Sequence, residues 1–100
     1  MNNSVNIIKT YEEFQKNTQL KPFDIKYMAI GMGGEVGEVL NEIKKMERDD
    51  NNVLTSNRKD KIIEELGDVL WYIVGTCRLI DTDLETVLNK NIEKLFIKKE

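Results

Sequence analysis

Residues 24–46, DIKYMAIGMGGEVGEVLNEIKKM, decide the fold. Apolar residues recur there at every third or fourth position, which is the spacing of one apolar face on an α-helix. The main apolar stripe is formed by Met28, Met32, Val36, Val39 and Ile43. Four glycines interrupt this helix, at positions 31, 33, 34 and 37, and each costs about 1 kcal/mol relative to alanine in a helix interior. Close packing or a ligand should therefore compensate for them.

The glycines do not match a dinucleotide-binding loop. In the pattern G-x-G-x-x-G, Gly31 and Gly33 match the first two glycines, but Val36 occupies the position of the third. The segment is also not followed by a second strand and a crossover, which that fold requires. Glycines 31, 34 and 37 instead lie along one flank of the predicted helix, where a ligand or a partner helix could approach the backbone closely.

A second long helix is predicted from about Arg58 to Ile80, after the polar loop ERDDNNVLTSN at residues 47–57. Its core face is the apolar stripe formed by Ile62, Leu66, Val69, Leu70, Ile73, Val74 and Cys77. The sequence contains neither internal repeats nor a convincing pair of strands. We therefore expect two long helices at the centre of the domain.

A shorter helix is predicted at each end of the chain. Thr10 with Glu13 forms a capping box before the first of these, and Thr82 with Glu85 forms another before the last. Four helices with short connections favour antiparallel packing. We therefore expect a single all-α domain over residues 1–100, a four-helix bundle with two long central helices and shorter first and last helices.

The composition excludes several classes of function. One third of the 100 residues are charged, the net charge is −3 and histidine is absent, so neither a nucleic-acid-binding surface nor a histidine metal site or base is expected. The single Cys77 excludes an intramolecular disulfide. Neither a signal peptide nor an apolar run of membrane-spanning length is present, which predicts a cytoplasmic protein without a membrane partner. Any acid–base or metal chemistry must therefore use carboxylates.

Carboxylates line the first long helix. On a helical wheel, Glu35, Glu38 and Glu42 lie within about 60° of one another along the edge of the apolar stripe. Glu35 has apolar neighbours one turn away on both sides, where an unpaired charge would be costly. Glu42 is expected on a solvated face, where Lys44 and Lys45 balance its charge.

The second long helix repeats this pattern. Glu65 and Asp68 lie three residues apart, and Asp68 stands within the apolar stretch GDVLWYIV, where an isolated carboxylate would be costly to desolvate. Two E-x-x-[ED] pairs on facing helices would bring four oxygen ligands to one divalent cation. We expect this cation to be Mg²⁺, because Mg²⁺ prefers oxygen ligands and keeps waters, whereas zinc favours histidine and cysteine ligands.

A polar residue interrupts the apolar stripe of the last helix. Asn91 falls among Val87, Leu88 and Leu95, and Lys94 is its neighbour one turn on. Two interpretations remain open at this point. Asn91 is either a core asparagine bonded to a helix end, or it forms with Lys94 a pair that binds a phosphate or a ribose hydroxyl of a ligand.

Three ordered blocks of the sequence resemble a known enzyme family. The blocks GGEVGEVLNEIKK, IIEELGDVLWYI and NIEKL, with a polar loop after the first, are similar to MazG-type nucleotide pyrophosphohydrolases over about residues 24–97. The resemblance implies an all-α fold that binds Mg²⁺ through an E-x-x-E…E-x-x-D constellation. It also implies hydrolysis of nucleoside triphosphates to nucleoside monophosphate and pyrophosphate.

The resemblance assigns the metal ligands. They are Glu35, Glu38, Glu65 and Asp68. Many members of the family carry a further glutamate immediately before the first pair, but this chain has Gly34 at that position, as the smaller phage-like members do. The number of bound ions therefore stays open.

The resemblance also assigns residues that act on the substrate. Asn91 and Lys94 match the block that contacts the phosphates of the nucleotide, and Tyr72 stands near it. Among the carboxylates, we name Glu38 as the catalytic base, because a carboxylate that is not fully engaged with the metal could accept the proton of the attacking water.

Two alternatives differ from this interpretation. The helix that carries Trp71 and Leu79 has a second apolar side, which a non-catalytic helical dimerisation module would use as its interface. A dUTPase-like all-α hydrolase of the same superfamily would prefer deoxyuridine di- or triphosphates. The second apolar side and the small core predict at least a homodimer, and the family resemblance adds the alternative of a homotetramer built as a dimer of dimers.

Overall fold

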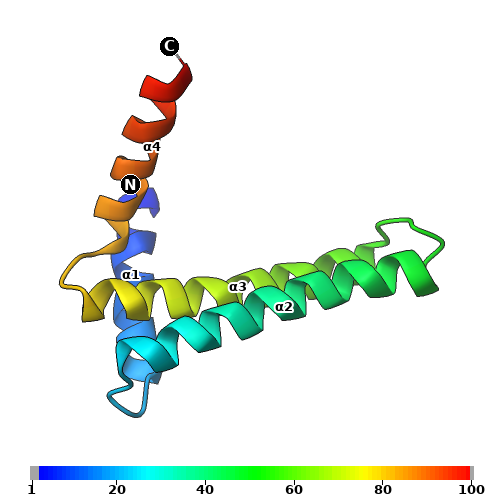
Figure 1. The fold of residues 1–100 in the computed structure, drawn as a ribbon, viewed down its shortest axis with the longest axis horizontal. Coiled ribbons are helices and arrows are strands. Elements are labelled where there is room, and N and C mark those ends of the chain that lie inside the picture. The colour runs from blue at the N-terminus through cyan, green and yellow to red at the C-terminus, as the bar shows by residue number, and fades with distance from the viewer. Residues whose placement is uncertain (1–2, 100) are drawn as a thin grey trace.

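Four α-helices make up the part of the chain that a computed structural model describes, which is the backbone of residues 3–99 and the side chains of residues 7–96 (Figure 1). The helices are α1 (Asn3–Thr18), α2 (Ile25–Asp49), α3 (Ser56–Leu79) and α4 (Leu84–Lys99). The predicted all-α class, with two long helices packed together and shorter first and last helices, is confirmed. None of the described helices is long and apolar enough to cross a membrane.

α2 and α3 form a long antiparallel hairpin (Figure 1). Asp24 caps the start of α2 and Thr55 caps the start of α3, since each side chain accepts a hydrogen bond from the amide three residues further on, at 2.8 and 3.1 Å. In the turn between the helices, Asn51 and Asn52 have positive φ angles of 55° and 58°. Asparagine tolerates this left-handed conformation better than most residues do, which favours a tight turn.

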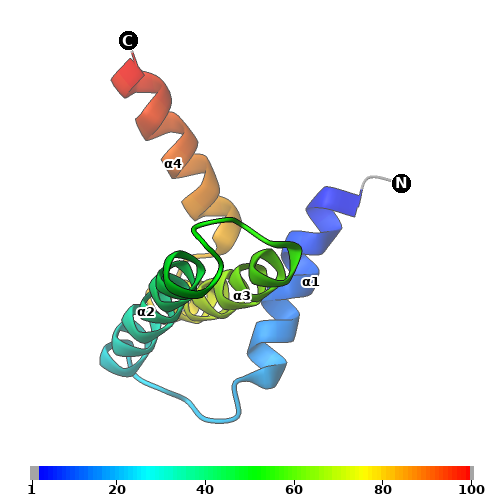
Figure 2. The same cartoon turned by 90° about the vertical axis from the view of Figure 1, so that its right-hand side faces the viewer.

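α1 and α4 lie at the end of the hairpin opposite this turn (Figure 1). α1 crosses α3, whereas α4 projects away from the hairpin, and the two outer helices diverge when the hairpin is viewed end on (Figure 2). Among residues 3–99, α2 packs against α3 alone, while α1, α3 and α4 contact one another. Among the described side chains, the buried apolar core is small and consists of Met28, Val74, Cys77 and Leu84.

A polar network fastens α1 to α3 and α4. The fully buried Gln15 accepts a hydrogen bond from Nη1 of Arg78 at 2.6 Å, and Nη2 of Arg78 donates to the carbonyl of Glu12 at 3.1 Å. The carboxylate of Glu12 in turn accepts the amide of Leu84, the first residue of α4, at 3.0 Å. α1 therefore holds the start of α4 in place.

The predicted capping box at Thr10 is wrong, because α1 begins at Asn3 and Thr10 lies inside the helix. Residues before Thr10 take part in the packing of this helix. Ile8 and Tyr11 line an apolar cavity of about 200 Å³ together with Leu70 of α3. Tertiary packing of this face extends the helix beyond the local capping signal, since most helix stability in proteins comes from such packing.

The predicted cap of the last helix is displaced by one residue. Asp83, and not Thr82, accepts the hydrogen bond from the amide of Thr86 at 2.8 Å. Asp83 stands three residues before that amide, which is the spacing of a helix cap, whereas Thr82 lies one residue too early. This bond also lowers the pKa of the Asp83 carboxyl, because it favours the charged form.

The chain exposes more surface than a compact protein of its size. Its accessible surface is 7745 Å², whereas a compact monomer of 11.6 kDa would expose about 5,800 Å². Its radius of gyration is 16.0 Å, against about 13 Å for a compact chain of this length. The predicted core residues Val36, Ile43 and Leu66 are 43%, 40% and 53% exposed. An open arrangement of helices accounts for this excess.

The predicted apolar stripe of α4 is exposed along its described length. Its members are Val87, Leu88, Asn91 and Leu95. Within one chain, therefore, Asn91 is exposed and does not lie in the core. The physical reason is that, in the described part of the chain, α4 projects away from the hairpin beyond its start, where Leu84 is buried.

Candidate metal centre

Three carboxylates converge where α2 faces α3. Carboxylate oxygens of Glu35 on α2 and of Glu65 and Asp68 on α3 all lie within 4.8 Å of one another. Glu35 and Glu65 are half-buried, and Asp68 is exposed. The antiparallel packing of the two helices produces this arrangement, because it sets the middle of α2 against the middle of α3. The structure thus brings together three of the four residues that were predicted as metal ligands.

The electrostatics of this group favour a bound cation. Burial raises the pKa of Glu35, and the neighbouring charges of Asp68 and Glu38 raise it further. The pKa of Glu65 is raised by burial first, then by the charges of Asp68, Glu38 and Glu35. These like charges repel one another in the metal-free protein, and a cation among them would relieve the repulsion.

Glu38, the fourth predicted ligand, lies outside this group of three. It is exposed on α2, one turn beyond Glu35. Its charge nevertheless contributes to the raised pKa values of Glu35 and Glu65, so it borders the group. Like Asp68, Glu38 is open to solvent.

Two aromatic residues extend the carboxylate group into a cavity. Glu35, Asp68, Trp71 and Tyr72 line a volume of about 290 Å³. The Trp71 and Tyr72 rings meet edge to face with centroids 5.0 Å apart, and the indole N–H of Trp71 donates to the Thr18 hydroxyl at 2.8 Å. Tyr72, predicted to contact the substrate, therefore lies beside the carboxylates, with an aromatic wall that α1 helps to orient.

Gly31 leaves room for the Tyr72 ring because it has no side chain. A Cβ atom at position 31 would overlap this ring and would lie 2.6 Å from its Cζ atom, so no larger residue fits without a shift. At Gly33, Gly34 and Gly37 a Cβ atom would meet nothing within 4 Å. Close packing within the chain therefore explains Gly31, whereas the other three glycines face open space.

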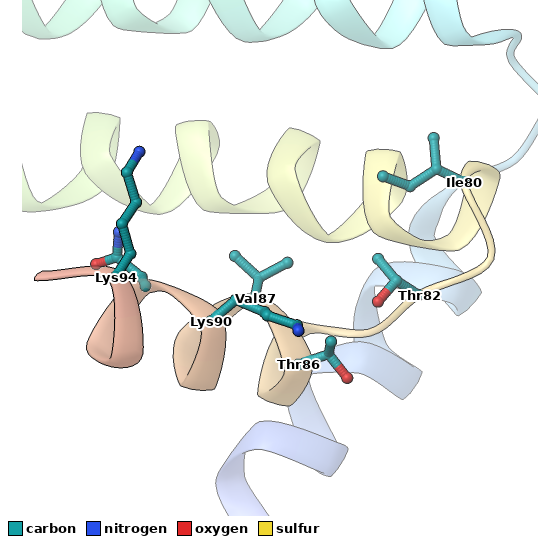
Figure 3. Close-up of a pocket in the computed structure, with 7 residues that line it drawn as sticks. Ile80, Thr82, Thr86, Val87, Lys90 and Lys94 are labelled. Atoms are coloured by element: carbon teal, nitrogen blue, oxygen red, sulfur yellow. The ribbon is translucent and has the colours of Figure 1, made fainter. Parts of the chain in front are cut away.

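Asn91 and Lys94 lie in a second cavity. It has a volume of about 440 Å³ between α4 and the end of α3, and Figure 3 shows Lys90 and Lys94 on α4 beside it. The lining residues are Ile80, Thr82, Thr86, Val87, Lys90, Asn91 and Lys94. Within one chain the structure does not bring Asn91 and Lys94 into the cavity of the carboxylates. Lys90 was not predicted, although its spacing of four residues from Lys94 places both lysines on one side of the helix.

Glu42 is buried, contrary to its predicted place on a solvated face. It is 8% exposed, and its main partner is Arg58 on α3, whose Nη1 lies 2.7 Å from Oε1 of Glu42. Lys45 is a more distant partner at 3.7 Å. The hydrogen bond from Arg58 lowers the pKa of Glu42. The wheel of one helix could not reveal this partner, because Arg58 comes from the facing helix.

A family comparison agrees with this geometry. Residues 23–99 match the family model of the MazG nucleotide pyrophosphohydrolase domain. The chain belongs to this family. The MazG match spans α2, α3 and α4 and begins after α1. The chain is also similar to the "Gene 37 protein" of Mycobacterium phage L5, with 38% identity over 76 residues that make up 76% of this chain and 67% of that protein. No solved structure matches this chain.

The carboxylates of this MazG domain fit Mg²⁺. All three converging groups offer oxygen atoms, which are the ligands that Mg²⁺ prefers. None of the three is fully buried, and Glu35 and Asp68 line a cavity, so waters and further oxygen ligands have room beside them. The chain has no histidine, and its one cysteine is buried elsewhere, so the donor set does not suit zinc.

Proposed function

We propose that this MazG-domain protein is an Mg²⁺-dependent nucleoside triphosphate pyrophosphohydrolase that releases nucleoside monophosphate and pyrophosphate. The observation that supports this function is the convergence of Glu35, Glu65 and Asp68 beside an aromatic cavity, in a domain of this family. In the proposed reaction, water attacks the α-phosphorus, and the bond from that phosphorus to the bridging oxygen breaks. Pyrophosphate then leaves.

In this proposal the carboxylates of Glu35, Glu65 and Asp68 hold the ion, and Glu38 is either a fourth ligand or the base. Bound Mg²⁺ supplies positive charge, which polarises the phosphate and offsets the negative charge that develops on its oxygens. Glu38 is exposed and lies outside the group of three, so a water molecule can reach it. As a base, Glu38 accepts one proton from the attacking water.

The proposed substrate contacts come from the cavity beside the carboxylates and from the cavity beside α4. Tyr72 and Trp71 present aromatic surface beside the carboxylates, on which the nucleoside part of the substrate can pack. Lys94 and Asn91, with Lys90, offer positive charge and an amide for the phosphates. Because these groups lie in separate cavities of one chain, a second copy that supplied its α4 would complete the site.

A homodimer, or a homotetramer, is therefore part of the proposal. The chain exposes about 1,900 Å² more than a compact monomer would, and a stable interface buries about 800 Å² on each partner. Exposed apolar residues lie on α2, α3 and α4, and among the described side chains of α4 the most exposed are Ile92 and Phe96 at 65% and 66%. Association would cover these side chains.

A panel of substrates tests the function. Each common NTP and dNTP, together with dUDP, is incubated with the protein and Mg²⁺, and the products are identified by anion-exchange chromatography. The proposal expects monophosphate and pyrophosphate, and expects EDTA to abolish turnover. Preference for dUTP and dUDP would support the dUTPase-like alternative. Release of diphosphate and phosphate would contradict the proposal, and absence of turnover with every substrate would support a non-catalytic dimerisation module.

A further inference from the structure

An ion cluster joins α2 to α3 near the turn of the hairpin. Arg58 of α3 donates from Nη1 to Oε1 of Glu42 at 2.7 Å and from Nε to Oδ2 of Asp50 at 2.8 Å. Its Nη2 lies 3.4 Å from the second oxygen of Asp50. The side chains of Arg58, Glu42 and Asp50 are only 12%, 11% and 17% exposed. One planar guanidinium thus holds two carboxylates of the facing helix in a fixed geometry.

The ends of both helices take part in this cluster. Asp50 is the C-cap residue that follows α2, and its amide donates to the carbonyl of Met46. Arg58 lies in the first turn of α3, where its own amide donates to the capping hydroxyl of Thr55. Movement of one helix along the other would therefore break the side-chain bonds of Arg58.

The same alignment of α2 against α3 sets the positions of both the ion cluster and the carboxylate group. Glu35 lies seven residues before Glu42 on α2, and Glu65 lies seven residues after Arg58 on α3. Seven residues are about two helical turns, or roughly 10.5 Å of rise, so both members of each pair lie on one face of their helix. Because the helices are antiparallel, the pairing of Arg58 with Glu42 also sets Glu65 opposite Glu35.

We propose that Arg58 is a positioning residue for the metal centre. Its bonds to Glu42 and Asp50 hold α2 and α3 in the register that keeps the three converging carboxylates together. Such a restraint matters because carboxylate oxygens from both helices lie within 4.8 Å of one another in this centre, and like charges at that distance repel when no cation lies between them. This inference rests on the proposed function, since it assumes that these carboxylates bind Mg²⁺.

A variant of Arg58 separates positioning from a simple effect of charge. Arg58→Met removes a positive charge near a site for a cation, so a purely electrostatic effect would tighten Mg²⁺ binding. Loss of the helix register would weaken Mg²⁺ binding, because the carboxylates would no longer be held in place. The two explanations thus predict changes of opposite sign in the dissociation constant.

Calorimetric titration with Mg²⁺ alone measures this constant without any substrate. We expect Arg58→Met to raise the Kd for Mg²⁺ roughly tenfold, the lower end of the range for residues that orient metal ligands. Arg58→Lys keeps the charge but cannot bind two carboxylates in the same planar geometry, so it should raise Kd by a smaller factor. Arg48→Met is the matched control, since Arg48 pairs with Asp49 at 2.7 Å near the same turn but is 61% exposed.

Circular dichroism shows which variants are folded at the temperature of the titration. Unchanged or tighter Mg²⁺ binding by folded Arg58→Met and Arg58→Lys would overturn the inference, and so would an equal loss in Arg48→Met. If Arg58→Met does not fold, Arg58→Lys decides alone. If the unaltered protein binds Mg²⁺ and the Arg58 variants bind it equally well, the inference fails but the proposed function stands. Failure of the unaltered protein to bind Mg²⁺ would overturn the metal centre and the inference together.

Discussion

The ring of Tyr72 lies against the backbone of α2 at Gly31, and this contact shows how single residues shape the candidate site. Glycine permits the approach because it has no Cβ atom. The ring then forms one wall of the cavity that contains Glu35 and Asp68. Gly34 lies three residues further along the same helix and faces open space, so it has no such packing role within the chain.

Alanine substitutions at these two glycines should therefore have opposite effects. Gly31→Ala should lower the free energy of unfolding by about 1–3 kcal/mol, because the new methyl group overlaps the Tyr72 ring. Gly34→Ala, the matched control, should raise it by about 0.5–1 kcal/mol, because alanine has the better helix propensity. Urea denaturation measures both values. Equal changes in the two variants would show that the Tyr72 ring moves aside without cost.

Asp68→Asn tests whether Asp68 is a metal ligand. The charge of Asp68 raises the pKa values of Glu35 and Glu65, so its removal should relieve repulsion. In EDTA the variant should melt no lower than the unaltered protein. A ligand at a hundredfold excess over Kd adds about 2.7 kcal/mol to the stability of a native state that binds it. With millimolar Mg²⁺ the variant should therefore gain less stability than the unaltered protein. It should also hydrolyse no substrate.

Thermal melts of both proteins, with EDTA and with Mg²⁺, provide the measurement for Asp68. An equal response to Mg²⁺ in the two proteins would show that Asp68 is not a ligand. Asp60→Asn is a suitable control, because Asp60 is an exposed aspartate on the same helix. It should leave the response to Mg²⁺ unchanged.

At the scale of the elements, the two long helices carry opposite electrostatic environments along their contact. Near the turn, Arg58 lowers the pKa of Glu42. Two turns away, burial and neighbouring carboxylates raise the pKa values of Glu35 and Glu65. The hairpin therefore gains stability from charge at one place and loses it at the other when no metal is bound.

This difference predicts how the effect of Glu35→Gln on stability depends on pH. The folded-state pKa of Glu35 is raised above its ordinary value of 4.5, so its charge destabilises the fold as pH rises through the folded-state pKa. Glutamine carries no charge at any pH. In EDTA, the melting temperature of the variant relative to the unaltered protein should therefore be lowest near pH 4 and should rise towards pH 7. A difference that does not depend on pH would contradict this.

The sequence was sufficient for some elements and not for others. It predicted α2 closely, because a long apolar period marks that helix locally. It did not predict the partner of Glu42 or the separation of Asn91 and Lys94 from the carboxylates. Both depend on how helices cross, and a helical wheel describes only one helix. The convergence of Glu35 with Glu65 followed from two acidic pairs on facing helices, which a pattern can reveal.

At the scale of the whole molecule, the open arrangement of helices predicts association. Multi-angle light scattering at micromolar concentration should give a mass of at least twice the 11.6 kDa of one chain. Phe96→Lys and Ile92→Lys, which place charges on the exposed side chains of α4, should lower this mass if α4 lies in the interface. Lys94→Met is the control, because it removes a charge from α4 instead of adding one. It should leave the mass of the assembly unchanged. A monomer in every sample would refute the prediction.

The polar network at the start of α4 has a consequence for protein engineering. Glu12 and Gln15, which bind the Leu84 amide and Arg78, belong to α1, whereas the family match begins at residue 23. A chimera that transplanted only the matched region would leave that amide and that guanidinium without these acceptors. Grafts of this domain should therefore carry α1 with them, or supply a carboxylate and an amide oxygen from the recipient scaffold.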